Sequence, residues 1–453
     1  MKKSVDLISE NILSSIIKLS IPILGTSFIQ MAYNMIDMIW VGRLGSNAVA
    51  AVGTAGFFTW FGTSLVFISK IGAEVFVAQE IGKDNIKEKN KYIYNSLFIN
   101  IIIALIYTII ILIFKRSLID FFKLGDSEIV TMAIDYLVII SLGMVFYFLN
   151  PLFTGIFNAS GNSKVPFIIN AVGLVFNIVF DPILIFGLFG IKPMGVIGAA
   201  IATVLAQIIV TILFVITFIR NGYSLSFKNI KYIDKKYIYK ICKIGIPTAL
   251  QNCSFAFFAM IIGRIVASWG AVAIAVQKVG SQIEAISWMT AEGFGAALTA
   301  FVGQNYGAKK FDRILKGYKI TMVMSIIIGA FATILLIFFG QSIFSIFIPE
   351  EEAIIGGASY LKILGFSQIF MCIEITTAGA FAGLGNTVTP SWVGIILTGF
   401  RIPLAIILAN LINLGIDGVW YSISITSIFK GILLFILFKI MFIKPNKKYY
   451  KNA

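Results

Sequence analysis

Long apolar runs follow one another along the whole chain, and they constrain its fold more than any other feature. A helix needs about 20 mostly apolar residues to cross a bilayer. Of the 453 residues, 58% are hydrophobic and only 13% are charged, about half the charged share of a soluble domain. We therefore predict an all-α polytopic membrane protein with twelve transmembrane helices. The expected spans are residues 14–41, 47–78, 92–114, 128–157, 165–190, 194–219, 241–268, 271–303, 316–342, 354–383, 390–412 and 416–441.

The two halves of the chain carry the same landmarks in the same order. Pro22 and Pro247 open the two halves, and Gly45 and Gly270 follow them at equal distances. Further matched pairs are Gln79/Gln304, Gly82/Gly307, Gly161/Gly385 and Gly195/Gly415. We infer a duplication into two six-helix lobes, and because each has an even number of spans, the repeats are parallel.

The expected lobes comprise residues 1–220 and 241–453, and a cytoplasmic linker over residues 221–240 joins them. Its composition suits a strap on the membrane surface with a short amphipathic helix.

Lysine and arginine are concentrated in the loops on one side of the expected spans. That side has both termini, the linker and the loops near Lys87 and Lys310, whereas few basic residues, among them Arg43 and Lys192, lie on the other side. The positive-inside rule then places both termini in the cytoplasm, in a multi-pass protein of the inner (plasma) membrane. Although the net charge is +15, we expect no nucleic-acid partner, because no soluble face presents the basic residues.

Several kinds of chemistry are excluded by composition. The chain has no histidine, which rules out a His-ligated metal and a Ser-His-Asp triad. It has no Gly-x-x-x-x-Gly-Lys-Ser/Thr motif for ATP phosphates. Energy for any transport would have to come from an ion gradient or a separate subunit.

A polar stripe within residues 14–41 is the first candidate site. Ser27, Gln30, Asn34 and Asp37 are three or four residues apart and so share one helix face. Polar residues at membrane depth are costly and are usually functional. A carboxyl group in such a place can take up and release a proton. The alternative is an interfacial Asp37 that reaches water or caps the turn at Gly42.

A second stripe, within residues 165–190, contains Asn170, Asn177 and Asp181. Because Pro182 follows, we expect non-helical geometry at Asp181 and unpaired carbonyl groups in the preceding turn. Carboxylate, amide and carbonyl oxygens are ligands that suit a hard cation such as Na⁺, and Thr203 could add a hydroxyl group. The alternative is a helix-packing Asp181 that is satisfied by Asn177.

A third stripe lies within residues 271–303. Gln277, Ser281, Glu284, Trp288 and Glu292 share one face, and two carboxylates flanking an indole suit a cationic aromatic ligand. The alternative is a mutually hydrogen-bonded helix interface.

Among the polar residues of the last three expected spans, we single out two. Glu374 could belong to a second cation site with Glu284 and Glu292, a question that the sequence leaves open. Arg401, just before Pro403, is expected to tether neighbouring helices rather than to contact substrate.

These motifs together resemble the multidrug and toxic compound extrusion (MATE) family over essentially the whole chain. The resemblance implies two six-helix lobes around a V-shaped cleft and electrochemical antiport of Na⁺ or H⁺ against cationic drugs. The residues that carry it are Ile21-Pro22 through Asn34, Asp37, Val41-Gly42-Arg43-Leu44-Gly45 and Ala50-Ala51; Asn177 to Pro182; Met194-Gly195 and Gly198 to Thr203; Phe301 to Ala308; and Arg401 to Leu404.

The resemblance is to branches of the family with an acidic first-lobe site. It implies that Asp37, Asn177 and Asp181 form the ion-coupling site, able to hold Na⁺, with Thr203 as a companion. Other branches have a glutamate eight residues after the proline of the seventh helix, where this chain has Phe255. Their second-lobe cation site is therefore not expected here in the same form.

We predict a secondary antiporter that exports small organic cations in exchange for Na⁺ or H⁺, and not an enzyme. It would act as a monomer in membrane lipid, with no cofactor beyond a bound Na⁺. Ion binding to the acids would bend or close the first lobe and expel substrate. The expected cavity residues are Gln30, Asn34, Gln277, Ser281, Glu284, Trp288 and Glu292. A flippase for lipid-linked molecules or oligosaccharides, from the same wider superfamily, is the alternative.

The duplication is broken at the acidic positions. By the repeat, Asp37 corresponds to Ile262, Asn177 to Arg401, and Glu374 to Asn150. The shared prolines and glycines define the scaffold, so we expect the broken positions to give the lobes different roles: ion coupling in the first and substrate contact in the second.

Overall fold

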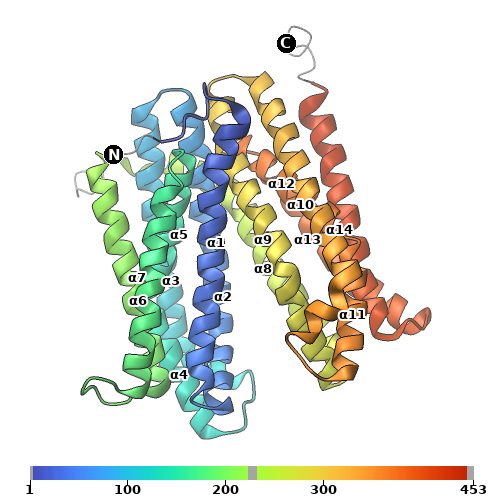
Figure 1. The fold of residues 1–453 in the computed structure, drawn as a ribbon. Helices are drawn as coiled ribbons and strands as arrows, with labels where there is room; N and C mark the ends of the chain where they lie inside the picture. The colour runs from blue at the N-terminus through green and yellow to red at the C-terminus, as the bar shows by residue number, and fades with distance from the viewer. Residues whose placement is uncertain (1–3, 223–231, 446–453) are drawn as a thin grey trace. The chain divides into compact units, whose positions relative to one another are not determined.

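The computed structural model describes residues 4–222 and 232–445, and these residues form helices joined by short loops (Figure 1). The helices of the first half are α1 (Ile12–Gly42), α2 (Ser46–Gly82), α3 (Ile86–Asp120), α4 (Ser127–Leu142), α5 (Met144–Ala159), α6 (Lys164–Phe186) and α7 (Gly195–Arg220). Those of the second half are α8 (Lys235–Ala267), α9 (Ala271–Gly307), α10 (Phe311–Ser345), α11 (Glu351–Gly365), α12 (Gln368–Gly383), α13 (Val388–Ile406) and α14 (Gly415–Phe438), with π-helical turns η2 (Ile407–Leu411) and η3 (Lys439–Ile443).

The prediction of an all-α protein with twelve spans is confirmed. The described residues contain ten single helices long and apolar enough to cross a membrane, and twelve spans when each of two bent helix pairs counts as one. The expected spans 128–157 and 354–383 are wrong in one respect, because each consists of two helices that meet at 50°. The breaks fall at Gly143 and at Phe366–Ser367.

The expected loss of helical geometry at Asp181 is also wrong. Helix α6 continues from Lys164 to Phe186 with Pro182 inside it. Prolines are tolerated within transmembrane helices because neighbouring helices and local adjustments satisfy the backbone groups that they release. The helix ends at Phe186, and the residue that follows it, Gly187, has a left-handed φ of 76°.

Contacts divide the chain into two compact units at different points from the expected lobe boundaries. The first unit comprises Ile21–Ala249, and the second comprises Val5–Ser20 and the chain from Leu250 onward. The first helix of each repeat, α1 or α8, is therefore split between the units close to its proline, Pro22 or Pro247. Helix α8 also takes up residues 235–240 of the expected linker. Residues 223–231 of that linker lie outside the described residues, so its expected amphipathic helix stays a prediction.

Each unit has an apolar interior and an apolar exterior. In the first unit Leu137, Met144 and Phe148 are fully buried where α4 and α5 meet α2 and α3. Yet Ile113 on α3 and Phe338 on α10 are 67% and 75% exposed. Large apolar side chains on the outer surface of helices of this length are typical of contact with lipid.

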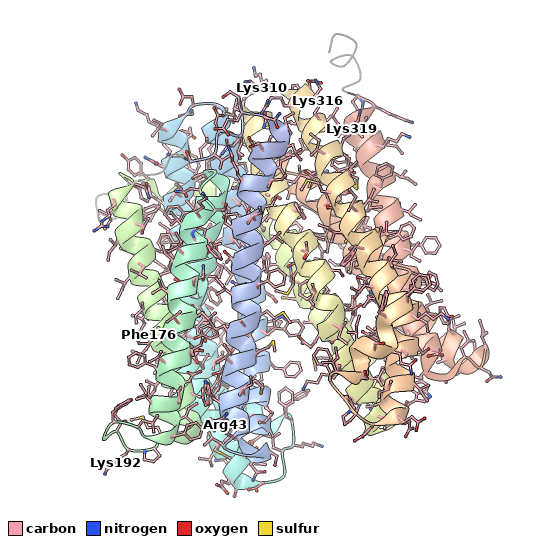
Figure 2. The ribbon with its side chains drawn as sticks, viewed as in Figure 1. Arg43, Phe176, Lys192, Lys310, Lys316 and Lys319 are labelled. Atoms are coloured by element: carbon pink, nitrogen blue, oxygen red, sulfur yellow. The ribbon has the colours of Figure 1, made fainter. Side chains whose placement is uncertain are left out.

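Basic residues gather at the ends of the helices in both units. Figure 2 shows Arg43 and Lys192 at the same end of the first unit, as expected for loops on one side. Lys310, Lys316 and Lys319 lie together at one end of the second unit, where α10 begins (Figure 2).

A glycine precedes the second helix of each repeat for a conformational reason. Gly45 has φ 110° before α2, and Gly270 has φ 95° before α9. Residues with a side chain rarely adopt such positive φ angles, whereas glycine does so freely. This matched pair is therefore explained by the turn that joins the first two helices of each repeat.

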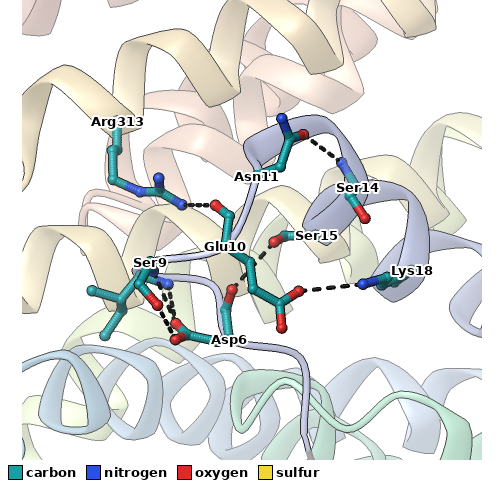
Figure 3. A network of polar contacts seen from close by, with 9 residues as sticks. Asp6, Ser9, Glu10, Asn11, Ser14, Ser15, Lys18 and Arg313 are labelled. Atoms are coloured by element: carbon teal, nitrogen blue, oxygen red, sulfur yellow. Dashed lines mark hydrogen bonds and ion pairs between the residues drawn. The ribbon is translucent and has the colours of Figure 1, made fainter.

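The segment before α1 is held to the second unit by polar contacts (Figure 3). Arg313 on α10 donates hydrogen bonds to the backbone oxygens of Leu7 and Glu10, at 3.2 and 2.8 Å. Asn305 on α9 donates to the same Leu7 oxygen at 2.9 Å. Within the segment, a hydrogen bond from the Ser9 hydroxyl lowers the pKa of Asp6 and so favours its charged form.

The segment before α8 has a matching arrangement in the first unit. The backbone oxygen of Tyr232, the counterpart of Leu7 in the repeat, accepts a hydrogen bond from Asn95 at 2.8 Å. Asn95 in turn accepts one from the backbone of Asp234 at 3.0 Å. In both repeats an asparagine therefore fixes the chain just before the first helix.

Replacing Arg313 by methionine is expected to loosen residues 5–11. A hydrogen bond from a charged donor contributes roughly 1.5–3 kcal/mol, so losing these bonds should speed amide hydrogen exchange in this segment by about tenfold or more. The matched control is Lys316→Met on the same helix, because Lys316 pairs with its helix neighbour Asp312, at 2.9 Å. Equal exchange rates in wild type and Arg313→Met would contradict the role given to Arg313.

Candidate ion-coupling site in the first unit

Four polar side chains predicted from sequence come together inside the first unit. Asp37 lies on α1, Asn177 and Asp181 on α6, and Thr203 on α7. The Asn177 amide donates to the Asp181 carboxylate at 2.8 Å. Asp37 interacts electrostatically with Asp181, and the Thr203 hydroxyl faces the Asp37 carboxylate without meeting the geometry of a hydrogen bond.

Each of these side chains has a buried oxygen without a hydrogen-bond partner. The atoms are Asp37 Oδ1, Asn177 Oδ1, Asp181 Oδ2 and Thr203 Oγ1. Asn177 and Asp181 are fully buried, and Thr203 is 3% exposed. Buried polar atoms are nearly always satisfied, and an exception calls for an explanation such as a bound ion. Four such oxygens from three helices form a cluster in which a hard cation or a proton would be stabilised.

Three tyrosines surround these carboxylates, and the sequence analysis missed them. Tyr33, Tyr136 and Tyr147 each interact electrostatically with both Asp37 and Asp181. The Tyr33 hydroxyl also donates to the Thr203 backbone oxygen at 3.4 Å. The position of Tyr33, one helical turn before Asp37, was a signal that could have been used. Tyr136 and Tyr147 lie on either side of the break between α4 and α5.

Other members of the two polar stripes lie outside this cluster. Gln30 and Asn34 are exposed on α1, and Ser27 donates to the Ile23 backbone oxygen at 3.4 Å. Asn170 donates to the Pro166 backbone oxygen at 2.7 Å. Of the residues that share a face in the two stripes, Asp37, Asn177 and Asp181 belong to the cluster.

The third predicted stripe lies on α9 in the second unit. Both oxygens of Glu284 accept hydrogen bonds, one from Tyr360 on α11 at 3.1 Å and one from Gln368 on α12 at 3.5 Å. Gln277, Ser281 and Trp288 are half-buried and Glu292 is exposed. Glu284 thus contributes to a hydrogen-bonded interface between helices.

Arg401 and Glu374 belong to the same part of the second unit. Arg401 on α13 donates to the hydroxyls of Thr426 and Ser427 on α14, at 3.2 and 3.4 Å, and so ties these helices together as expected. Glu374 on α12 pairs with Lys430 on α14 at 3.0 Å.

Comparison with known proteins places this architecture in a family. The MatE family matches residues 22–183 and 247–407. The probable multidrug resistance protein NorM of Thermotoga maritima is 29% identical over 427 residues, which cover 93% of this chain and 91% of the relative. The probable multidrug resistance protein YoeA of Bacillus subtilis is 26% identical over 409 residues, which cover 88% of this chain and 88% of the relative.

Solved structures share the fold. The outward-facing structure of a multidrug resistance MATE family transporter of the MOP superfamily has a TM-score of 0.87 at 24% identity, with 98% of each chain covered. A MATE crystal structure in a straight conformation has a TM-score of 0.88, also at 24% identity, with 99% of this chain and 100% of that chain covered. The chain belongs to the MatE family of membrane transporters.

Proposed function

We propose that this protein is a secondary multidrug antiporter that exports small organic cations in exchange for Na⁺ or H⁺ bound at Asp37, Asn177, Asp181 and Thr203. The observation that carries the proposal is the set of four buried, unpaired oxygens on three helices of the first unit. Relatives described as multidrug resistance proteins support the export of drug-like molecules.

The charge at this cluster supports coupling to a cation. Two carboxylates lie close together, and no lysine or arginine of the described residues is among the groups that act on them. Two ionised carboxylates away from water repel each other and are poorly solvated. Uptake of a proton or of Na⁺ relieves both problems, so the cluster should hold a cation whenever one is supplied.

Binding at this cluster would draw three helices of the first unit together. Asp37 is on α1, Asp181 on α6 and Thr203 on α7, and a cation shared by their oxygens favours the arrangement in which those oxygens converge. If the cation binds this arrangement of the helices more tightly than another, it shifts the conformational equilibrium toward it. In the proposed mechanism this is the state that releases substrate, so cation and substrate occupy the protein in turn.

Trp288 and Glu292 on α9, with Gln277 and Ser281, are proposed substrate contacts, whereas both oxygens of Glu284 are taken up in the interface between helices. Acidic and aromatic groups attract organic cations through charge and cation–π interaction. Gln30 and Asn34, which are exposed on α1, are proposed for the same role. The protein would work as a monomer in the plasma membrane with both termini in the cytoplasm.

Transport by purified protein in lipid vesicles tests this proposal. Vesicles loaded with a cationic dye should lose it rapidly under an inward Na⁺ gradient or an inward H⁺ gradient, and slowly when neither gradient is imposed. A dye without charge and of similar size is the matched substrate control. Folded protein that moves dye at the same rate with and without both gradients would contradict antiport.

A further inference from the structure

Two acidic and two basic side chains, Glu284, Glu374, Arg401 and Lys430, lie near one another within the helix bundle of the second unit. Lys430 Nζ lies 3.0 Å from Glu374 Oε1, and these side chains are only 10% and 11% exposed. Arg401 lies near enough to act electrostatically on Glu374, Glu284 and Lys430. With all four groups ionised, their charges cancel, so this cluster needs no cation from outside.

All groups in this cluster have partners on neighbouring helices. Glu284 on α9 accepts from Tyr360 and Gln368, and Arg401 on α13 donates to hydroxyls of α14. The first unit differs, since Asp37 and Asp181 each retain an oxygen without a partner. Asp37 and Asp181 are therefore available to a cation, whereas Glu284 and Glu374 are already paired.

The repeat shows what Lys430 adds at this place. Glu374 corresponds to Asn150 on α5 of the first unit. Asn150 donates to the Gln207 side chain at 2.7 Å and accepts from Thr211 at 2.7 Å, and both partners lie on α7. A neutral contact thus joins the equivalent helices in the first unit. A buried ion pair seldom adds net stability over a neutral contact. The Glu374–Lys430 pair therefore differs from the Asn150 contacts chiefly in that a carboxylate is present and is already neutralised by an ammonium group.

We infer that Lys430 is a built-in counter-cation for Glu374, and that it and Arg401 confine cation exchange to the first unit. Lys430 places an ammonium group where an exchangeable cation would otherwise bind Glu374. Because a tethered cation cannot leave during the transport cycle, Glu374 takes no part in coupling. This inference rests on the proposed function, since it concerns which carboxylates exchange the coupling ion.

The test measures cation-dependent thermal stabilisation of the full-length protein in detergent, as Na⁺ replaces choline and as pH is varied. A cation that binds only folded protein raises Tm in a saturable way. Wild type should show this rise, and Asp37→Asn/Asp181→Asn should show none. Adding Lys430→Met to that double variant should restore a saturable rise, because Glu374 is then uncompensated, and adding Glu374→Gln as well should abolish it again.

Two outcomes overturn the inference. One is a saturable response in Asp37→Asn/Asp181→Asn that disappears when Lys430→Met and Glu374→Gln are both added, because the second unit then exchanges cations of its own. The other is a folded Asp37→Asn/Asp181→Asn/Lys430→Met protein with no response. A response that survives every one of these changes would instead contradict the proposed function, because the exchanged cation would bind elsewhere.

A variant that keeps the charges balanced covers the case in which Lys430→Met alone prevents folding. Glu374→Gln/Lys430→Met removes both partners and leaves no unpaired charge, so it is expected to fold. Its gradient-driven dye efflux should match that of wild type, since Glu374 exchanges no ion. Loss of gradient dependence in this folded variant would overturn the inference.

Discussion

Replacing Asp37 by asparagine should strongly reduce the stimulation of efflux by a cation gradient, with little effect on folding. The change keeps the size of the side chain and removes the negative charge that attracts the cation. Coupling free energies between sites are typically 1–3 kcal/mol, so gradient stimulation should fall by about 5- to 150-fold. The measurement is dye efflux from vesicles under the gradient that drives wild type, at equal amounts of incorporated protein.

Asp120→Asn is the matched control for this prediction. Asp120 ends α3 and is 52% exposed, and its ion pair with Arg116 spans 3.7 Å. The same chemical change at this surface site should leave gradient-driven efflux unaltered, because exposed pairs of this kind contribute little. If Asp37→Asn and Asp120→Asn both behaved like wild type, Asp37 would have no part in coupling.

The second large effect is expected at Gly245 on α8. A methyl group there would overlap the backbone carbonyl of Ile68 on α2, and a backbone cannot move aside as a flexible side chain can. Overpacking a filled site costs about 1–3 kcal/mol, and this site should lie at the upper end of that range. Gly245→Ala should therefore lower the yield of folded protein and its Tm in detergent.

Gly263→Ala tests whether this effect comes from contact rather than from glycine as such. Gly263 lies in the same helix, α8, and among the described residues no atom outside its own helical turn lies within 4 Å of the place its methyl would take. Alanine favours a helix interior over glycine by roughly 0.5–1 kcal/mol, so the Tm should be unchanged or higher. Equal losses of Tm at both positions would show that close packing against Ile68 is not the cause.

The spans and the repeat could be predicted because both depend on local sequence. The length of each apolar run matches the thickness of a bilayer. Matched glycines such as Gly45 and Gly270 mark a positive φ that the local turn requires. The break at Gly143 could not be read this way, because both α4 and α5 are apolar and a single glycine is tolerated inside a helix. The two helices pack against α2, α3 and α7, and such tertiary contacts are not specified by the local sequence.

The candidate site was predicted in part for the same reason. Asn177 and Asp181 share a face of one helix, so their spacing alone predicts their contact. The prediction that Asp181 leaves helical geometry failed because a membrane-spanning helix can retain an internal proline. Tyr136 and Tyr147 reach the site through the fold of α4 and α5, which no periodicity in the sequence specifies.

The central claim is that substrate and cation exchange through the cluster at Asp37 and Asp181, and reversed coupling tests it most directly. Protein in vesicles is given a substrate gradient and no cation gradient, and movement of Na⁺ or H⁺ is recorded with a radioactive tracer or a pH-sensitive dye. Wild type should drive one of these cations in the direction opposite to substrate, and Asp37→Asn/Asp181→Asn should drive neither. Cation movement that is equal in wild type and the double variant, or absent from folded wild type that transports substrate, would contradict the account.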